Sequence, residues 1–183
     1  MTIEEHRADL TNRIATIALA DRLDALALRG LAKRLATSGR MLLYYFQTKD
    51  ELVTAALVRV SEQTAELLRP IEEAPPCTPG ALMEQVLTAS AASEFAPFLR
   101  IWTEVVARWG RREAPYNAIS QIIVERWIAW TEERLVPGTR GHAHAVAISL
   151  LAMVDGLTLL EMASPGCTEG ARKLLPAVCR GLG

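Results

Sequence analysis

Apolar residues recur at helical spacing along the N-terminal part of the chain. Between about residues 3 and 23 they fall three or four positions apart, as at Leu10, Ile14 and Ala18, which predicts one amphipathic helix. From residue 28 to 35 the apolar positions are i, i+3, i+4 and i+7, which predicts a second, short helix with its basic residues outside. The hydrophobic pattern thus starts as that of an all-α protein.

A break and two capping signals follow the second helix. Thr37-Ser38-Gly39 interrupts the pattern, and Ser38 is placed to cap a third short helix through Tyr45. Thr48-Lys49-Asp50-Glu51 is a capping box, in which a Thr hydroxyl and a Glu carboxylate satisfy each other's backbone donors. A long fourth helix is therefore expected from about Lys49 to Leu68. Two short helices joined by a brief turn, after a supporting helix, are typical of a helix-turn-helix.

A proline-rich segment divides the chain. Residues 70–80 hold four prolines in eleven positions and cannot be helical throughout. The remainder shows no strand-like alternation. Its expected helices run from about Pro79 to Ala92, Phe95 to Trp109, Arg112 to Leu135, Thr139 to Ala163 and Thr168 to Arg180. We therefore expect about nine helices in an all-α chain: a helix-turn-helix domain at 1–48, a connecting helix at 49–69 and a helical domain at 70–183.

Composition and charge add a second indication. A chain of 183 residues, half of them hydrophobic, suits one compact globular unit or a small domain docked on a larger one. The net charge of −1 hides an uneven distribution, because residues 22–49 hold six bases and one acid. A basic segment on an acidic body is typical of a small nucleic-acid-reading head, although ordinary solvated helices show the same pattern.

Three stretches of the head combine in a recognisable way. They are Leu28-Arg29-Gly30-Leu31-Ala32, Thr37-Ser38, and the run from Leu43 to Leu52, whose most specific positions are Tyr44, Phe46, Lys49 and Leu52. Over about residues 7 to 56 the chain resembles the amino-terminal domain of the tetracycline-repressor (TetR) family of bacterial transcription regulators. The resemblance implies nine helices, with a ligand-binding and dimerisation domain after the head. In that second domain the likeness lies in the arrangement of helices and not in sequence motifs.

The head departs from the family pattern at three places. Ala36 stands where the family has a glycine before the recognition helix, and Ala27 stands where it has a capping Ser or Thr. The loop around Gly39 is one residue longer. Two registers, one residue apart, therefore fit residues 38–42.

The residue types suggest how the head would contact DNA. A phenol at Tyr44 or Tyr45 can reach a phosphate, and in the family this pair touches the DNA backbone. Lys49, in the first turn of the fourth helix, suits a bound phosphate. Arg40 would read guanine or contact phosphate, while Met41 or Leu42 packs on thymine methyls. The candidate DNA-binding residues are Arg29, Ser38, Arg40, Met41, Leu42, Tyr44, Tyr45 and Lys49. A small core is expected from Leu31, Ala32, Leu35, Leu43 and Phe46.

The four tryptophans cluster in the second half of the chain. They are Trp102, Trp109, Trp127 and Trp130, and the first two lie seven residues apart on one helical face. They either belong to the core or line a cavity, and the resemblance implies a pocket for a small inducing ligand. The candidate ligand-binding residues are Trp102, Glu104, Arg108, Trp109, Tyr116 and Trp127.

The segment from Ala143 to Ala163 is apolar nearly all round and long enough to suggest a membrane span. His144, Asp155, Gly156 and Glu161 within it argue against one. Such a helix usually packs on its own core and on a partner subunit. We therefore expect a homodimer through about residues 139–180, in line with the dimer interface of the family. Gly156 either allows a close helix approach there or is without consequence.

Other classes of function have little support in the sequence. GxSxG, P-loop, GxGxxG and HExxH motifs are absent, and the His142-x-His144 spacing puts the two rings on different helix faces. Neither catalysis, a cofactor nor a metal site is expected. The polar, acidic first residues do not suit a signal peptide, and three cysteines without a CxxC pair suit the cytoplasm.

These observations predict a cytoplasmic, ligand-responsive transcription regulator. In this interpretation the chain is a repressor that binds a palindromic, double-stranded operator as a homodimer and is released by a small, mainly apolar molecule. One alternative is an all-helical ligand-binding or protein-interaction module that no longer reads an operator. Another is a basic head that binds DNA without sequence specificity.

Overall fold

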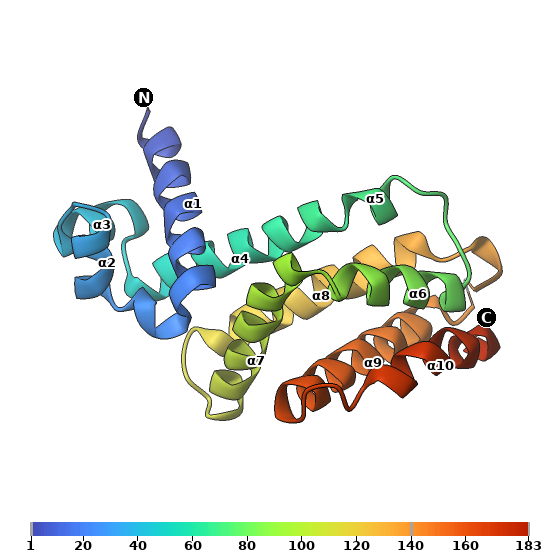
Figure 1. Cartoon of the computed structure of the whole chain (residues 1–183). Coiled ribbons are helices and arrows are strands. Elements are labelled where there is room, and N and C mark those ends of the chain that lie inside the picture. The colour runs from blue at the N-terminus through green and yellow to red at the C-terminus, as the bar shows by residue number, and fades with distance from the viewer. Residues whose placement is uncertain (1, 140, 183) are drawn as a thin grey trace. The chain divides into compact units, whose positions relative to one another are not determined.

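The computed structural model describes residues 2–139 and 141–182, and within them the chain is all-α (Figure 1). The α-helices are α1 (Ile3–Asp21), α2 (Leu28–Arg34), α3 (Gly39–Phe46), α4 (Lys49–Leu67), α5 (Arg69–Glu72), α6 (Pro79–Ser90), α7 (Ala96–Gly110), α8 (Tyr116–Arg134), α9 (Ala143–Ala163) and α10 (Glu169–Cys179). Short 3-10 helices are η1 (Leu23–Leu26), η2 (Ser93–Phe95), η3 (Pro137–Thr139) and η4 (Arg180–Leu182). The predicted fold class is confirmed.

The helix beyond the predicted nine is α5, which has only four residues. Its first turn contains Pro70, whose missing N–H would have no partner inside the helix at that position. The proline that indicated the end of the preceding helix therefore also starts a new one. The nine predicted helices are all present, with ends that differ by a few residues.

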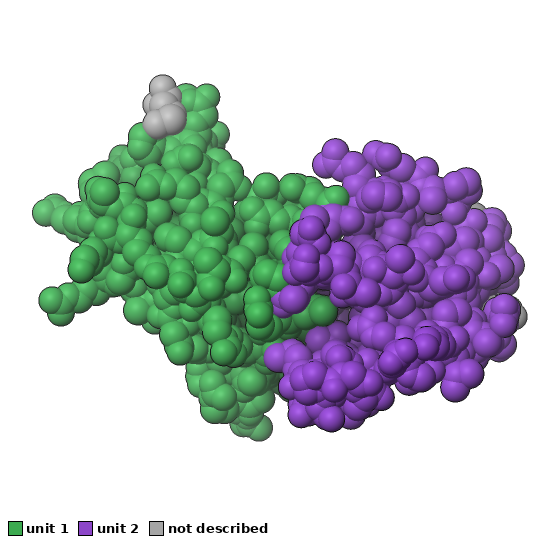
Figure 2. All heavy atoms as spheres, in the orientation of Figure 1, with its two compact units in different colours: residues 1–66, 97–123 green, residues 67–96, 124–183 purple. Residues whose placement is uncertain are grey.

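The chain divides into two compact units (Figure 2). Unit 1 comprises the residues up to Glu66 together with Pro97–Ile123, and unit 2 comprises Leu67–Ala96 together with the residues from Val124 onward. The prolines suggested a simpler division, with all residues after 70 in one body. Instead, most of α7 and the first half of α8 pack with the head.

The core of unit 1 is built on the three N-terminal helices. α2 packs against α3, and α1 packs against both α3 and η1. Leu31, Ala32, Leu35 and Phe46 are buried as predicted. The prediction for Leu43 is wrong, because its side chain is 36% exposed while Leu42 is fully buried. With α3 beginning at Gly39, Leu42 and Phe46 share the inner face, one turn apart.

The helix caps of unit 1 differ in part from expectation. Ser38 caps α3 as predicted, accepting a hydrogen bond from the Met41 N–H at 3.1 Å. Thr48 accepts from the Glu51 N–H at 3.0 Å, but the predicted reciprocal bond is not formed. The Glu51 carboxylate instead accepts from Arg7 of α1 at 2.7 Å. This contact ties the start of α4 to α1.

Unit 2 is centred on close packing between α6 and α10. The contact depends on Gly80, because a Cβ at this position would lie 2.5 Å from the backbone oxygen of Pro176. Leu82, Met83 and Leu87 of α6 are buried, as are Val146, Ala147 and Leu150 of α9 and Cys179 of α10. Glycine at this position thus allows two helix backbones to approach more closely than a side chain would permit.

Candidate nucleic-acid interface and ligand region

The turn between α2 and α3 has left-handed backbone at Ala36, with φ of 52°. An L side chain in this region costs about 1 kcal/mol. The turn is closed by the Thr37 N–H, which donates to the Ala32 carbonyl at 2.9 Å. Ala36 therefore occupies the conformation that favours glycine, the residue that the family pattern has there. The departure leaves the turn intact but strained.

The outer face of α3 presents a mixed polar and apolar surface. Arg40 is exposed, Met41 is 43% exposed and Tyr44 is 61% exposed. Leu43 also points outward, although the sequence suggested a place in the core. Such a face offers a guanidinium, a phenol and two apolar side chains, the groups that contact phosphates, base edges and thymine methyls.

Leu42 does not belong to this surface. Its side chain is fully buried, so the prediction that it contacts DNA is wrong. The two registers left open by the sequence are thereby resolved, because the cap at Ser38 fixes where α3 begins and hence which side chains face inward. Leu43 takes the outward position.

Exposed basic side chains occur on α2, on α3 and at the start of α4. Arg29 and Lys33 of α2 are exposed, as are Arg40 and Lys49, the first residue of α4. Arg34 differs, because it forms an ion pair with Asp21 at the end of α1, which lowers the pKa of that carboxyl. Exposed cations of this kind are the groups that attract a phosphate backbone.

The second tyrosine of the pair has a partner that the sequence did not indicate. Tyr45 is half-buried and stacks on His6 of α1, with ring centroids 5.7 Å apart and planes inclined by 8°. Tyr44 meets Tyr45 edge-on at 5.2 Å. Because Tyr45 is stacked on a residue of α1, the phenol of Tyr44 is the more accessible of the two. The contact joins positions that are distant in sequence, and no local pattern predicts it.

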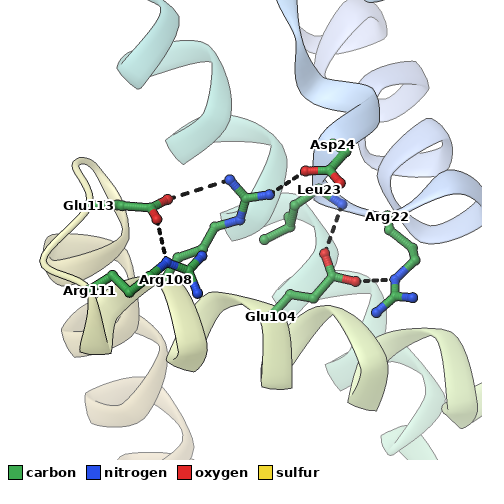
Figure 3. A network of polar contacts seen from close by, with 7 residues as sticks. All are labelled: Arg22, Leu23, Asp24, Glu104, Arg108, Arg111 and Glu113. Carbon is green, nitrogen blue, oxygen red and sulfur yellow. Dashed lines mark hydrogen bonds and ion pairs between the residues drawn. The ribbon is translucent and has the colours of Figure 1, made fainter.

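Two of the predicted ligand residues, Glu104 and Arg108, lie in a polar network with Arg22 and the start of η1 (Figure 3); a third, Tyr116, contacts Arg108. Glu104 accepts hydrogen bonds from Arg22 and from the Leu23 N–H, the latter at 3.1 Å. Arg108 pairs with Asp24 and lies 3.5 Å from the Glu113 carboxylate. The Arg108 guanidinium also lies over the ring of Tyr116, 5.3 Å from its centroid. Burial raises the pKa of Tyr116.

The tryptophans are divided between the two units. In unit 1, Trp102 and Trp109 lie on one face of α7 with Val106, and Trp109 is 54% exposed. In unit 2, Trp127 and Trp130 of α8 meet edge-on at 5.7 Å. The Trp130 Nε1 is buried without a hydrogen-bond partner among the described residues. The six predicted ligand residues are therefore not gathered in one unit.

The helix α9 and its neighbour α10 leave many apolar side chains uncovered. The large exposed ones are Ile148, Leu159, Leu160, Met162, Leu174 and Val178. By length and composition, α9 is the one helix of the described residues that could cross a membrane, a test that core helices also pass. Glu161 lies within it, and its carboxylate accepts from the Gly166 N–H at 2.7 Å and from the Thr168 hydroxyl.

No cluster of three or more potential metal ligands occurs in residues 2–139 and 141–182. The ring of His144 is instead bonded through Nδ1 to Glu132 at 2.7 Å. His142 precedes the first residue of α9.

No protein-family model and no protein of curated function matches the sequence. Solved structures do match. A protein from Rhodococcus sp. described as a TetR-family transcriptional regulator has a TM-score of 0.77 at 18% identity, over 98% of each chain. A transcriptional regulator from Rhodococcus sp. Rha1 has a TM-score of 0.71 at 21% identity, over 94% of this chain and 95% of that one.

A third similar structure contains a bound small molecule. It is described as a transcriptional regulator from Saccharomonospora viridis in complex with choline, with a TM-score of 0.70 at 16% identity over 95% of each chain. The likeness runs through nearly the whole of all three chains, which includes the helix-turn-helix and the helices after it. The chain therefore has the fold of the TetR-family transcriptional regulators.

Proposed function

We propose that this protein is a ligand-responsive, DNA-binding transcription regulator that acts in the cytoplasm as a homodimer. The observation that carries the proposal is the exposed face of α3, with Arg40, Met41 and Tyr44 outside a well-formed helix-turn-helix. The fold supports it, since similar structures are described as transcriptional regulators. In this proposal the protein represses its target and leaves the operator when the ligand binds.

Each exposed side chain has a proposed part in the complex. Arg40 and Met41 contact base edges in the major groove, while Tyr44, Lys49 and Arg29 bind phosphates. Ser38 holds α3 in place through its cap, which also puts its hydroxyl near the groove. Tyr45 supports Tyr44 and adds a phenol at the edge of the surface. Leu43 replaces Leu42 as the second apolar contact.

The uncovered apolar side chains of α9 and α10 support dimerisation through about residues 139–180. Only 28% of the most apolar stretch of α9 is buried within the chain, and a second copy can cover the remainder by two-fold symmetry. Two α3 helices related by that symmetry read two half-sites of a roughly palindromic duplex, at least about one turn of DNA apart.

The proposed effector is a small, mainly apolar molecule held by aromatic side chains. Trp127 and Trp130 of unit 2 supply ring faces and an indole N–H without a partner, and Trp102 and Trp109 supply a second aromatic group in unit 1. Choline, which the similar protein from S. viridis binds, is a cation of the kind that aromatic faces attract. A ligand screen should therefore include quaternary ammonium compounds beside aromatic ones.

The decisive experiment is selection of binding sites from a random duplex library, followed by footprinting on the recovered sequence. The proposal expects a two-fold symmetric footprint and a dimer by sedimentation. Lys49→Ala should weaken binding to every sequence and lower the salt dependence by about one unit of slope, whereas Arg40→Ala should change the sequence preference. Recovery of no preferred sequence would favour a non-specific basic head, and no DNA binding would favour a ligand-binding module.

A further inference from the structure

Two side chains of α7, one helical turn apart, hold the connection between α1 and α2. Glu104 accepts from the Leu23 N–H at 3.1 Å and from the guanidinium of Arg22. Arg108 pairs with Asp24. All three partners lie in residues 22–24, where α1 has ended and η1 begins (Figure 3). A backbone donor and two charged side chains of the head are thus fixed from one face of α7.

The backbone held by this contact is strained. Arg22 has φ of 71° and ψ of 179°, a region that is used almost only by glycine. Such a residue keeps its conformation only where its surroundings over-determine it. Glu104 meets this requirement, because it binds the side chain of the strained residue and the N–H of the next one. The contact therefore stabilises a conformation that the local sequence does not favour.

The two ends of the contact differ in burial. The side chains of Glu104 and Arg108 are 18% and 23% exposed, whereas that of Asp24 is 92% exposed. Arg108 is also fixed within its own part of the unit, by Glu113 and by the ring of Tyr116. The α7 end of the contact is consequently the more buried one, and the charged side chains that meet it from the head, Arg22 and Asp24, are largely exposed.

A shift of residues 22–24 would be passed to the helix-turn-helix. Leu23 and Leu26 of η1 are each 2% exposed, and η1 packs against both α1 and α2. Because α2 packs in turn against α3, η1 cannot move alone. Closely packed elements tend to change between discrete arrangements and do not deform continuously.

We propose that Glu104 and Arg108 are positioning residues for DNA binding, which hold η1, and through it α2 and α3, in the orientation that fits DNA. The inference rests on the proposed function of α3. In this proposal the two side chains stabilise the head, and they do not belong to the ligand site to which the sequence assigned them. They act without contacting DNA, by raising the population of the binding-competent head.

The first test compares DNA affinities of graded variants, with the duplex selected by the wild-type protein as the probe. Glu104→Leu removes both contacts and should weaken binding about tenfold, the size of a typical coupling between two sites. Glu104→Gln keeps an oxygen for the Leu23 N–H, so it should recover much of this loss. Asp24→Asn changes a solvated partner and should weaken binding only about twofold.

A matched control separates this effect from a general change in charge. Glu133 of α8, in unit 2 and outside the proposed dimer interface, is 69% exposed and forms an ion pair with Arg134 at 3.7 Å, and Glu133→Gln should leave DNA affinity unchanged. The salt dependence adds a second readout. Since neither Glu104 nor Arg108 contacts a phosphate in this proposal, Glu104→Gln should retain the wild-type slope, in contrast to Lys49→Ala.

A further measurement needs no DNA. Amide hydrogen exchange at Leu23 in the free protein should become faster in Glu104→Leu and stay near the wild-type rate in Glu104→Gln, because only the former removes the acceptor. Unchanged exchange in both variants would contradict the contact itself.

The outcomes separate the inference from the proposed function. If the wild-type protein selects no duplex, the proposed function fails, while hydrogen exchange still reports on the contact. If the wild-type protein binds and folded Glu104→Leu binds equally well, the positioning role is wrong. If Glu104→Leu does not fold, the DNA affinity of a double variant that combines Glu104→Gln with Asp24→Asn is measured instead. Wild-type affinity in that double variant would overturn the inference.

Discussion

In unit 1, segments far apart in the sequence are joined by pairs of oppositely charged side chains, such as Arg7 with Glu51 and Arg108 with Asp24. In unit 2, the long-range contacts include two from arginines to backbone carbonyls, from Arg134 to Glu72 and from Arg172 to Leu87, beside the bond between His144 and Glu132. There the helices also meet through a glycine, at Gly80. Ion pairs are thus prominent among the contacts that arrange unit 1, and close packing of helix backbones is prominent among those that arrange unit 2.

This difference has a consequence for function. A head arranged by ion pairs can respond to salt and to small movements of α7, because each pair is directional and partly solvated. A body arranged by close packing keeps its form and presents an apolar surface, which suits a dimer interface. The following changes test the two arrangements separately.

The largest expected effect is on dimerisation, at the uncovered apolar side chains of unit 2. Leu160 of α9 is 57% exposed in the chain. Leu160→Lys would bury an unpaired charge in the proposed interface, so the dissociation constant should rise by about a hundredfold or more. Sedimentation across a concentration series measures this.

The control for this change is Val106→Lys on α7, in unit 1, where an apolar side chain is 41% exposed. It should leave the dimer intact. A dimer that survives Leu160→Lys but not Val106→Lys would place the interface on α7.

Gly156→Arg adds a finer test, since a Cβ at Gly156 meets no atom of the chain within 4 Å; an unchanged dimer would exclude that residue from the interface.

The next effect concerns packing inside unit 2. Gly80→Ala brings a Cβ to 2.5 Å from the Pro176 oxygen, and relief requires the two helices to separate. The free energy of unfolding should fall by about 2 kcal/mol, although alanine is the better helix former. Urea denaturation monitored by circular dichroism gives the value.

Gly170 provides a matched control, because it is likewise the second residue of its helix and has open space around it. Gly170→Ala should therefore be neutral or slightly stabilising. Equal losses in both variants would show that the close approach of α6 and α10 contributes nothing specific.

A smaller effect, of opposite sign, is expected in the turn of the head. Ala36 has a φ of 52°, and glycine adopts this conformation without the clash of a Cβ. Ala36→Gly should raise the free energy of unfolding by about 0.5 to 1 kcal/mol, because the strain removed exceeds the entropy lost. Ala91→Gly, at an exposed position with φ of −79°, should not stabilise the protein, because there is no strain to remove. A loss of stability in Ala36→Gly would show that the turn is not strained.

Local signals explain what the sequence could predict. The helices and the cap at Ser38 follow from patterns that extend over a few residues, and these patterns placed most helix ends well. Leu42 and Leu43 were interchanged because α3 has only eight residues, too few for periodicity alone to fix which side chain faces inward. In the structure, the cap at Ser38 fixes where α3 begins, and with it which side chains face inward.

Contacts between distant segments were beyond such patterns. Arg22 and Glu104 are 82 positions apart, and Asp24 and Arg108 are 84 apart. Nothing near Glu104 or Arg108 indicates these partners, so both were assigned to a ligand pocket with the tryptophans of the same helix. For the same reason, the sequence divided the chain at its prolines and did not show that α7 packs with the head.

The smallest expected effect is on stability in acid. Each unit has its own carboxylate with a lowered pKa, so the two units can be tested separately. In unit 2, hydrogen bonds from the Thr168 hydroxyl and the Gly166 N–H lower the pKa of Glu161 below its ordinary value of 4.5. In unit 1, the hydrogen bond from Arg111 lowers the pKa of Glu113 in the same way. A carboxyl whose pKa is lower in the folded state stabilises the fold above its unfolded pKa, and this stabilisation is lost as the pH falls through the folded value.

Unfolding by urea at pH 7 and at pH 4 should therefore show a lower stability in acid for the wild-type protein. Glu161→Gln and Glu113→Gln should each reduce the difference between the two pH values, because each removes one carboxyl that must be protonated. Glu169→Gln changes a carboxylate whose ion pair is solvated on both sides, so it should leave the difference nearly unchanged. If only Glu113→Gln reduces it, the acid sensitivity belongs to the ion-paired unit, and the Glu161 hydrogen bonds contribute to shape alone.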